Sequence, residues 1–285
     1  LRSAFIPIFF LFSMKIATWN VNSIRTRLEH LTQWLAETAI DVVCLQETKV
    51  TDGQFPQEAL ASQGYHCYVF GQKAYNGVAL LSRESLEKVR YGFSGVLGTE
   101  IDPLWDDQKR VISAQCQGIT IVNVYVPNGS SMGSDKYHYK LRWFEVFHQY
   151  LERLLQENDR LHICGDFNIA PDDRDIYDSS EKENHIMATA QERQALQQIL
   201  SLGFCDAFRY LHSDTEQFTW WDYRAASFRR NLGWRIDHHY VSKPLVPAIV
   251  HCTIDRLPRT WEKPSDHTPV VLTLSSPSLS PLMNL

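Results

Sequence analysis

The amino-acid sequence predicts a protein of the α/β or α+β class. Short apolar runs that are typical of strands recur along the chain and alternate with segments whose apolar residues repeat at helical spacing. No fixed-period repeat or low-complexity block divides the 285 residues. Because large α/β folds reach this length as one unit, we expect a single domain over residues 14–275. The strand-like runs are Met14–Trp19, Asp41–Gln46, Gly77–Leu81, Val111–Cys116, Ile119–Val126, Leu161–Gly165, Arg235–Val241 and Pro269–Leu274.

Three segments have the amphipathic pattern of helices. The third begins with a capping box, in which Thr189 and Glu192 can each bond the other's backbone N–H. Gly203 stands where this helix would stop, because glycine accepts the left-handed backbone of a helix C-terminus. The first two segments carry apolar faces formed by Leu28, Leu31, Trp34 and Leu35 in one, and by Leu141, Phe144, Phe147, Tyr150, Leu151, Leu154 and Leu155 in the other.

The composition is that of a globular protein and argues against a disordered chain. Hydrophobic residues make up 44% and charged residues 21%, and the formal net charge is −5. A negative chain is unsuited to coating nucleic acid non-specifically, but it is compatible with a metal site built from carboxylates. The six cysteines include no CxxC pair, so we interpret them as small buried side chains in a reducing compartment.

Both ends of the chain differ from the rest. Residues 1–13 include an apolar run, Ala4–Phe12, that is too short to cross a bilayer and lacks a convincing signal-cleavage site. We expect the natural chain to begin at Met14, with residues 1–13 as a non-native extension; a targeting segment is the alternative. On the first interpretation the protein is cytoplasmic. Residues 276–285 are polar and proline-containing, which predicts a frayed tail.

Strand after strand ends in a carboxylate or a carboxamide. Acidic groups next to buried apolar strands are unfavourable unless they are paired or bind a metal ion. If these groups converge at one end of a sheet, they form a divalent-cation site. Any one of them alone is more typical of a turn or a helix cap. The side chains at these strand ends are Asn20, Gln46, Glu47, Asp166, Asn168 and Asp237.

Spacing along the strands groups further side chains, because residues two apart point to the same face. Asn123 and Tyr125 share a face. Asp166 and Asn168 do so if the extended backbone continues, and both pairs can then reach one cavity. Asp266–His267 immediately precedes the last apolar run. An Asp that bonds a neighbouring or facing His fixes its tautomer and favours the protonated ring, which suits a phosphate group.

Six blocks of sequence follow one another in a specific order: Thr18–Arg25, Leu45–Lys49, Asn123–Gly129, Gly165–Pro171, Trp234–Asp237 and Lys263–His267. Together they resemble the motif blocks of the exonuclease III family of apurinic/apyrimidinic endonucleases. The resemblance covers Met14 to about Leu274. It implies a four-layer αββα sandwich of the endonuclease/exonuclease/phosphatase type, in which two sheets pack face to face with helices outside.

The resemblance also implies roles for single positions. Glu47 is the implied principal metal ligand, Asp166 and Asn168 act on the attacking water, and Asp237 orients His267, which holds a phosphate oxygen. Oxygen ligands of this kind suit Mg²⁺, with Mn²⁺ as a substitute. The implied catalytic set is Tyr125, Asp166, Asn168, Asp237, Asp266 and His267, and the implied metal-site set is Asn20, Glu47, Asp166, Asn168, Asp266 and His267.

Aromatic residues and arginines are mixed in residues 218–235. Rings can wedge against bases or an empty sugar, and arginines can pair with phosphates, so Trp220, Arg224 and Trp234 are candidates for contact with DNA. A packed loop with solvated arginines is the alternative. Residues 129–140, with Lys136, Tyr137 and Lys140, are a second candidate for a loop that contacts DNA, together with the nearby Arg142. The stretch Asp172–His185 is acidic, and we expect it to lie away from the duplex.

The implied function is Mg²⁺-dependent phosphodiester hydrolysis in base excision repair. It comprises incision on the 5′ side of abasic sites, 3′-to-5′ exonuclease action and removal of blocked 3′ ends. The implied partner is double-stranded DNA with abasic sites or 3′ ends; we expect a monomer and no membrane. One alternative is a phosphatase or phosphodiesterase of the same fold that acts on inositol phosphates or lipids, where several relatives would carry a histidine in place of Tyr125. A catalytically inactive DNA-binding protein is disfavoured because Glu47, Asp166 and His267 are all present.

Overall fold

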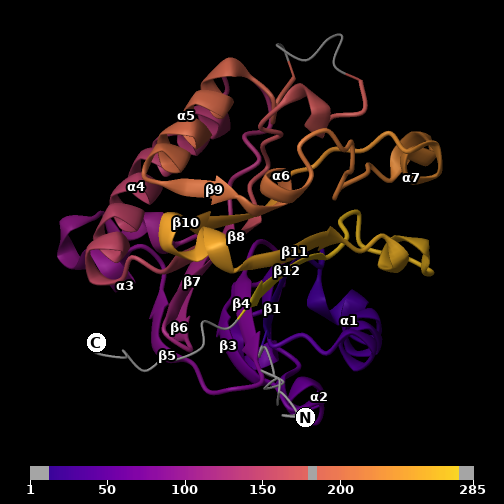
Figure 1. Ribbon diagram of the computed structural model, residues 1–285, viewed down its shortest axis with the longest axis horizontal. Helices are drawn as coiled ribbons and strands as arrows, with labels where there is room; N and C mark the ends of the chain where they lie inside the picture. Colours follow the sequence, from indigo (N-terminus) through magenta and orange to yellow (C-terminus); the bar gives the residue numbers. More distant parts are fainter. Residues whose placement is uncertain (1–12, 179–184, 276–285) are drawn as a thin grey trace, which may run out of the picture.

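The computed structural model describes residues 13–178 and 185–275, and it consists of two six-stranded sheets packed face to face with helices on both outer surfaces (Figure 1). This is the four-layer αββα sandwich that the sequence implied. Residues 1–12 of the predicted extension and the predicted tail at 276–285 lie outside the described residues. No helix within the described ranges is long and apolar enough to cross a bilayer.

The two sheets have similar topologies. The first has the strand order β11-β12-β1-β2-β4-β3 and the second has the order β5-β6-β7-β8-β10-β9. Each contains one parallel pair, β1 with β2 and β7 with β8, and all other pairs are antiparallel. The strands are β1 Ser13–Asn20, β2 Val42–Gln46, β3 His66–Phe70, β4 Val78–Ser82, β5 Glu87–Tyr91, β6 Val111–Cys116, β7 Ile119–Tyr125, β8 Leu161–Asp166, β9 Phe204–Asp206, β10 Asp237–Ser242, β11 Ile249–Ile254 and β12 Val270–Ser275.

The central core lies between the sheets. Alternate residues of the inner strands point into it, for example Met14 and Ile16 of β1 and Ile121 of β7. The intervening residues face the helices, so that Ala17 and Trp19 belong to a separate outer cluster. Strands buried on both faces appear in sequence as continuous apolar runs, which is why β1, β2 and β8 could be predicted.

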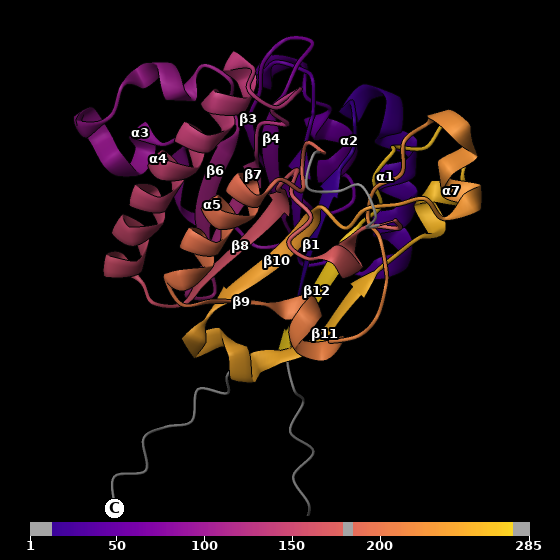
Figure 2. The ribbon, with the colours of Figure 1, turned by 90° about the horizontal axis from the view of Figure 1, so that it is seen from above.

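Helices cover the outer face of each sheet. Trp34 and Leu35 of α1 pack on the first sheet, and Phe147 of α4 and Ile199 of α5 pack on the second. Figure 2 shows α4 and α5 on one side of the paired sheets and α1 on the other. The helices are α1 Ile24–Thr38, α2 Gln57–Ala61, α3 Ser94–Leu97, α4 Asp135–Glu157, α5 Ala190–Ser201, α6 Ala207–Leu211 and α7 Ser227–Arg230.

The three predicted helices are confirmed as α1, α4 and α5. Thr189 and Glu192 form the predicted capping box at the start of α5. Gly203 follows the end of this helix with a φ of +105°. All six cysteines are free; Cys67 and Cys205 are partly exposed and the other four are buried.

Strand direction places the predicted site residues at one edge of the sandwich. The parallel pairs β1–β2 and β7–β8 each end at a common edge of their sheet. The antiparallel neighbours β12 and β10 begin at those edges, so the residues before β12 and at the start of β10 lie there too. Residues from both sheets therefore meet at this edge.

Candidate active site

Most of the strand-end side chains come together as the sequence predicted. Gln46 does not, because it is fully buried and its Nε2 donates to Thr18 Oγ1 and Asn123 Oδ1. Asn20 is the last residue of β1 and Glu47 follows β2, while Tyr125 and Asp166 end β7 and β8. Asp237 opens β10 and pairs in register with Asp166, which pairs on its other side with Tyr125. Three site residues of the second sheet thus lie side by side on neighbouring strands.

The Asn20 carboxamide connects the two sheets. Its Nδ2 donates to Glu47 Oε1 and to Asp166 Oδ2, both at 2.9 Å. Glu47 Oε1 also accepts a hydrogen bond of 2.8 Å from the Tyr125 hydroxyl. Burial, with the Glu47 carboxylate next to it, raises the pKa of Tyr125 well above 10, so its phenol stays protonated and acts as a donor.

His267 lies between two carboxylates and is almost fully buried. Its Nδ1 is 2.9 Å from Asp237 Oδ2, and its Nε2 is 3.7 Å from Asp166 Oδ2. Burial alone would lower the pKa of His267, but the two carboxylates outweigh it and raise this pKa to about 10. The imidazole is therefore a cation at neutral pH. The predicted contact between Asp237 and His267 is present.

Burial raises the pKa of Asp166 to about 7, and the neighbouring Asp237 carboxylate adds to the effect while His267 opposes it. A carboxyl group that titrates near pH 7 can give and take a proton under physiological conditions.

The residue before Asp166 is Gly165, which allows β8 to approach β7 closely, because a Cβ at this position would lie 1.9 Å from the Val124 carbonyl oxygen.

Asn168 reaches the site by a different route from the one expected. Its φ of +48° ends the extended backbone, so it does not share a strand face with Asp166. A turn brings the two together instead, and the Asn168 N–H donates to Asp166 Oδ1 at 2.9 Å. Asn123 does not reach the cavity, because it is fully buried and its Nδ2 donates to the backbone carbonyls of Leu45 and Ala79.

Glu47 and Asp266 are the carboxylates of the cluster that line the open cavity. Burial by itself would raise the pKa of Glu47, but the Lys49 ammonium 2.8 Å from its Oε2 keeps this pKa below its usual value. The pKa of Asp266 is likewise lowered against burial, by His267 and by hydrogen bonds from Trp220 and Asn22. Both side chains are therefore ionised at neutral pH.

The residues present fit a hard divalent cation. Asp166 and Asp237 supply buried carboxylate oxygens that lie within 4.8 Å of one another and of the His267 ring, which is protonated and has no lone pair to offer a metal ion. Glu47 and Asp266 add two ionised carboxylates that border the same cavity. The donor set is dominated by oxygen and contains no thiol, which favours ions such as Mg²⁺ or Mn²⁺ over zinc.

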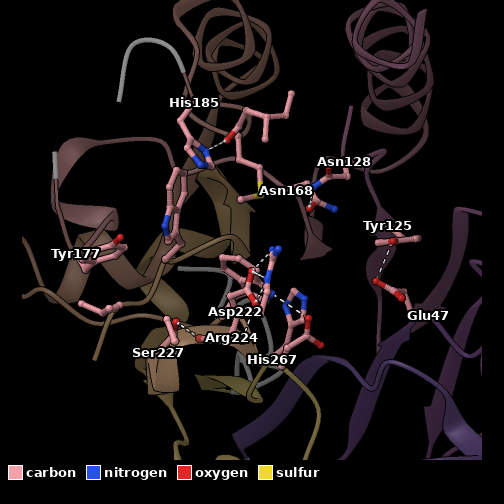
Figure 3. A pocket seen from close by; sticks show the side chains of 17 residues that line it. Glu47, Tyr125, Asn128, Asn168, Tyr177, His185, Asp222, Arg224, Ser227 and His267 are labelled. Atoms are coloured by element: carbon pink, nitrogen blue, oxygen red, sulfur yellow. Dashed lines mark hydrogen bonds and ion pairs between the residues drawn. The ribbon is translucent and has the colours of Figure 1, made fainter. Parts of the chain in front are cut away.

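Figure 3 shows the cavity that Glu47, Tyr125 and His267 border. Its volume is about 600 Å³. Trp220 and Trp234 line it and pair with each other through an isolated antiparallel bridge, and a second bridge joins Trp220 to His267. Arg224 lines it as well, with its exposed guanidinium 2.7 Å from Asp222. Arg142 is exposed on α4 and is not among the lining residues, so its contact with DNA remains a prediction.

Several lining residues were missed. Tyr177 and His185 border the cavity. Two described parts of the acidic stretch Asp172–His185, which we expected to lie away from the duplex, therefore reach the site. Its charge is partly turned inward, because Asp175 is fully buried between Arg209 and Arg235. The His185 ring packs 4.8 Å from that of Trp234. The lining residues that were not predicted are Asn128, Tyr177, His185, Ile186, Met187, Asp222, Ala225, Ser227 and Leu232.

Comparison with known proteins decides the family. A sequence profile of the Endonuclease/Exonuclease/phosphatase family matches residues 17–267. The chain belongs to this family. The exodeoxyribonuclease of Bacillus subtilis (strain 168) is 34% identical over 92% of this chain and 100% of its own length. Exodeoxyribonuclease III of Haemophilus influenzae is 35% identical over 90% of this chain and 98% of its own length.

Solved structures of the family have the same fold. A 3′ phosphatase from Neisseria, bound to a product DNA hairpin, superposes with a TM-score of 0.87 at 40% identity, and the match covers 92% of this chain and 100% of that one. An AP endonuclease from Archaeoglobus fulgidus gives a TM-score of 0.86 at 39% identity, over the same shares of both chains. Together with the sequence relatives, these neighbours support the conclusion that this family member is a DNA repair nuclease of the exodeoxyribonuclease III/AP endonuclease type.

Proposed function

We propose that this nuclease hydrolyses phosphodiester bonds in double-stranded DNA with the help of Mg²⁺, cutting on the 5′ side of abasic sites and trimming or unblocking 3′ ends during base excision repair. The observation that carries the proposal is one cavity whose wall joins a charged cluster to two tryptophans. The carboxylates Glu47 and Asp266 lie on the charged side, and Trp220 and Trp234 form the aromatic side.

The charges of the cluster suit hydrolysis of an anionic ester. The protonated ring of His267 can hold a non-bridging phosphate oxygen as charge builds up on it. Asp166 can take the proton of the attacking water, since its pKa is raised to about 7. The neutral Tyr125 phenol can donate its proton toward the leaving oxygen. A bound Mg²⁺, held by Glu47 with Asn20 and Asp266, would supply further neutralisation of the phosphate charge.

The aromatic side of the cavity suits a nucleotide without a base or at a chain end. Trp220 and Trp234 offer apolar faces on which a sugar or a base can pack. The neighbouring Arg224 is exposed and can contact a phosphate once it leaves Asp222. We expect the enzyme to act as a monomer.

The test compares three substrates in the presence of Mg²⁺ and in the presence of EDTA. They are a duplex with one abasic-site analogue, a duplex with a recessed 3′-phosphate, and an inositol polyphosphate. We expect metal-dependent turnover of both DNA substrates and none of the third. The variants Glu47→Gln and Asp166→Asn should lose this activity. Glu157→Gln, which breaks a surface ion pair with Arg90, should retain it.

Each result has a distinct meaning. Phosphate release from the inositol compound without cutting of DNA would refute the proposed substrate and favour the phosphatase alternative. Binding of the abasic duplex without any turnover would instead identify an inactive DNA-binding protein. Equal activity in EDTA would contradict the proposed role of Mg²⁺.

A further inference from the structure

Behind the cavity lies a buried cation that the chemistry above does not use. Lys140 projects from α4, and its side chain is fully buried. Its Nζ donates three hydrogen bonds, to the carbonyl oxygen of Asn168 at 2.7 Å, to that of Asn128 at 3.2 Å and to Glu192 Oε1 at 2.5 Å. An ammonium group has three protons, so this one is fully used.

Glu192 is the partner charge and is also fully buried. Besides Lys140, its Oε1 accepts the N–H of Met187 at 3.1 Å. Its Oε2 accepts the N–H and the hydroxyl of Thr189, which completes the capping box of α5. The ion pair therefore fastens three segments to one another: the loop after β7, the loop after β8 and the start of α5.

All three fastened segments contribute to the wall of the cavity, through Asn128, Asn168 and Met187. Figure 3 shows Asn128 and Asn168 next to each other on this wall, and the Asn128 Nδ2 donates to Asn168 Oδ1 at 3.0 Å. Asn168 has a left-handed backbone, which asparagine tolerates better than most non-glycine residues and which hydrogen bonds on both sides of this residue stabilise. Lys140 holds its carbonyl group, while Asp166 accepts its N–H.

The packing leaves little space for these loops to shift. Gly129 has a φ of +93°, and a Cβ there would lie 3.3 Å from Lys140 Cδ and 3.0 Å from Ile186 Cδ1. A chain that needed only a stable core here could fill the space with apolar side chains, since a buried ion pair is seldom more stable than such packing. The pair is suited instead to fixing a single arrangement of three backbone segments.

We propose that Lys140 and Glu192 are positioning residues for the reaction, and that they hold Asn168 and Asn128 where the substrate phosphate and its attacking water must be aligned. This inference rests on the proposed function for its kinetic part only. Its structural part, that the pair fixes the conformation of both asparagine loops, stands without any substrate.

The experiment uses the full chain with Lys140→Met, Glu192→Gln and the double variant. Lys140→Met alone leaves a buried carboxylate without a partner, so this variant can fail to fold. The double variant removes both charges and keeps a hydrogen-bonding side chain at position 192. The matched control is Arg90→Met with Glu157→Gln, which removes the ion pair near the opposite end of α4, where Nη2 of Arg90 lies 2.6 Å from Glu157 Oε2.

Two readouts are measured at a temperature well below the melting point of every variant. The first is kcat and KM on the DNA substrate that the wild type turns over. We expect kcat of the double variant to fall by about 10- to 100-fold, because small misplacements of aligning groups have effects of this size. KM should change by less than about threefold, since the aromatic wall and Arg224 are untouched. The control pair should change neither.

The second readout is amide hydrogen exchange in residues 126–129 and 167–170 without substrate. We expect faster exchange there in the double variant and unchanged exchange in β1. Unaltered exchange in both loops would overturn the inference, as would a kcat within about twofold of the wild type or a loss confined to KM. If the wild type turns over no DNA substrate, the proposed function fails, and the exchange result still tests the positioning role.

Discussion

His267 and Asp237 form a couple that lies across the two sheets: the imidazole precedes β12 of the first sheet, and the carboxylate opens β10 of the second. Both carboxylate oxygens are within 3.1 Å of the ring Nδ1. The contact fixes the orientation of the ring and leaves Nε2 directed toward Asp166, 3.7 Å away. The orientation of the His267 ring therefore depends on how the first sheet packs against the second.

Replacing Asp237 by Asn keeps the size of the side chain and removes its charge. We expect kcat to fall by about 100-fold or more, because His267 loses the neighbour that keeps it protonated. KM should change little. Single-turnover kinetics on the abasic duplex measure the effect, and a melting curve checks that the variant is folded. A kcat within about threefold of the wild type would rule out this role for Asp237.

The stability of the metal-free protein should decrease as the pH rises above 6.5. The pKa of His267 is raised from 6.5 to about 10, so its contribution is fully present below 6.5 and is lost as the pH approaches 10. The pKa of Asp166 is raised from 3.8 to about 7, so its contribution to stability is fully present below pH 3.8 and is lost as the pH rises to about 7. Both shifts have the same sign. Melting temperatures in EDTA between pH 5 and 10 test this, with His267→Gln expected to flatten the upper part of the profile.

Replacing Glu47 by Gln should weaken Mg²⁺ binding by at least about tenfold, since the site loses an ionised carboxylate that borders the cavity. Titration calorimetry with Mg²⁺ alone measures the affinity. Glu157→Gln removes a carboxylate far from the cavity and serves as the control. Equal affinities for the wild type and Glu47→Gln would show that the ion binds elsewhere.

Two substitutions of Trp220 separate its ring from its N–H group. The indole Nε1 donates to Asp266 Oδ2 at 3.0 Å, and the ring lines the cavity. Trp220→Ala should raise KM for the abasic duplex by about tenfold, a typical effect of losing an aromatic stacking surface. Trp220→Phe keeps a ring and should mainly lower kcat, because Asp266 loses a donor. Steady-state kinetics distinguish the two patterns, and identical patterns would count against a packing role for the ring.

Gly165→Ala should destabilise the fold by about 1–3 kcal/mol or more, because the new methyl group would overlap the Val124 carbonyl of the adjacent strand. Urea unfolding of the metal-free protein measures the change. Gly53→Ala is the matched control, since no atom lies within 4 Å of a Cβ at that position. Equal stability of the two variants would mean that β7 and β8 adjust more easily than their spacing suggests.

Much of the fold could be predicted because the central strands are apolar on both faces. Strands β3, β5, β9 and β11 were not predicted, and three of them, β3, β5 and β11, have several exposed or partly exposed positions. β5 reads Glu-Lys-Val-Arg-Tyr, and β9 is only three residues long. Short or polar strands at a sheet edge lack the continuous apolar pattern of the central strands. They form because their backbone pairs with a neighbouring strand, and this pairing cannot be recognised from the residue types alone.

The site was predictable where a functional side chain ends a buried strand, as Asn20 and Asp166 do. It was not predictable where a loop returns to the cavity from elsewhere, as with Tyr177 and His185. The position of Asn168 was correct but its geometry was not, because a positive φ leaves no mark in a pattern of residue types. The prediction that Lys140 belongs to a loop that contacts DNA was wrong, because it lies on α4 and is fully buried. Nothing in the sequence distinguishes a buried lysine from an exposed one.

The meeting of the two sheets at one edge also means that neither sheet alone carries a working nuclease. Asn20 and Glu47 belong to the first sheet, and Tyr125, Asp166 and Asp237 belong to the second. A chain in which only one sheet has formed lacks the groups that the other sheet supplies. The cluster is therefore complete only in a chain whose two sheets have packed against each other.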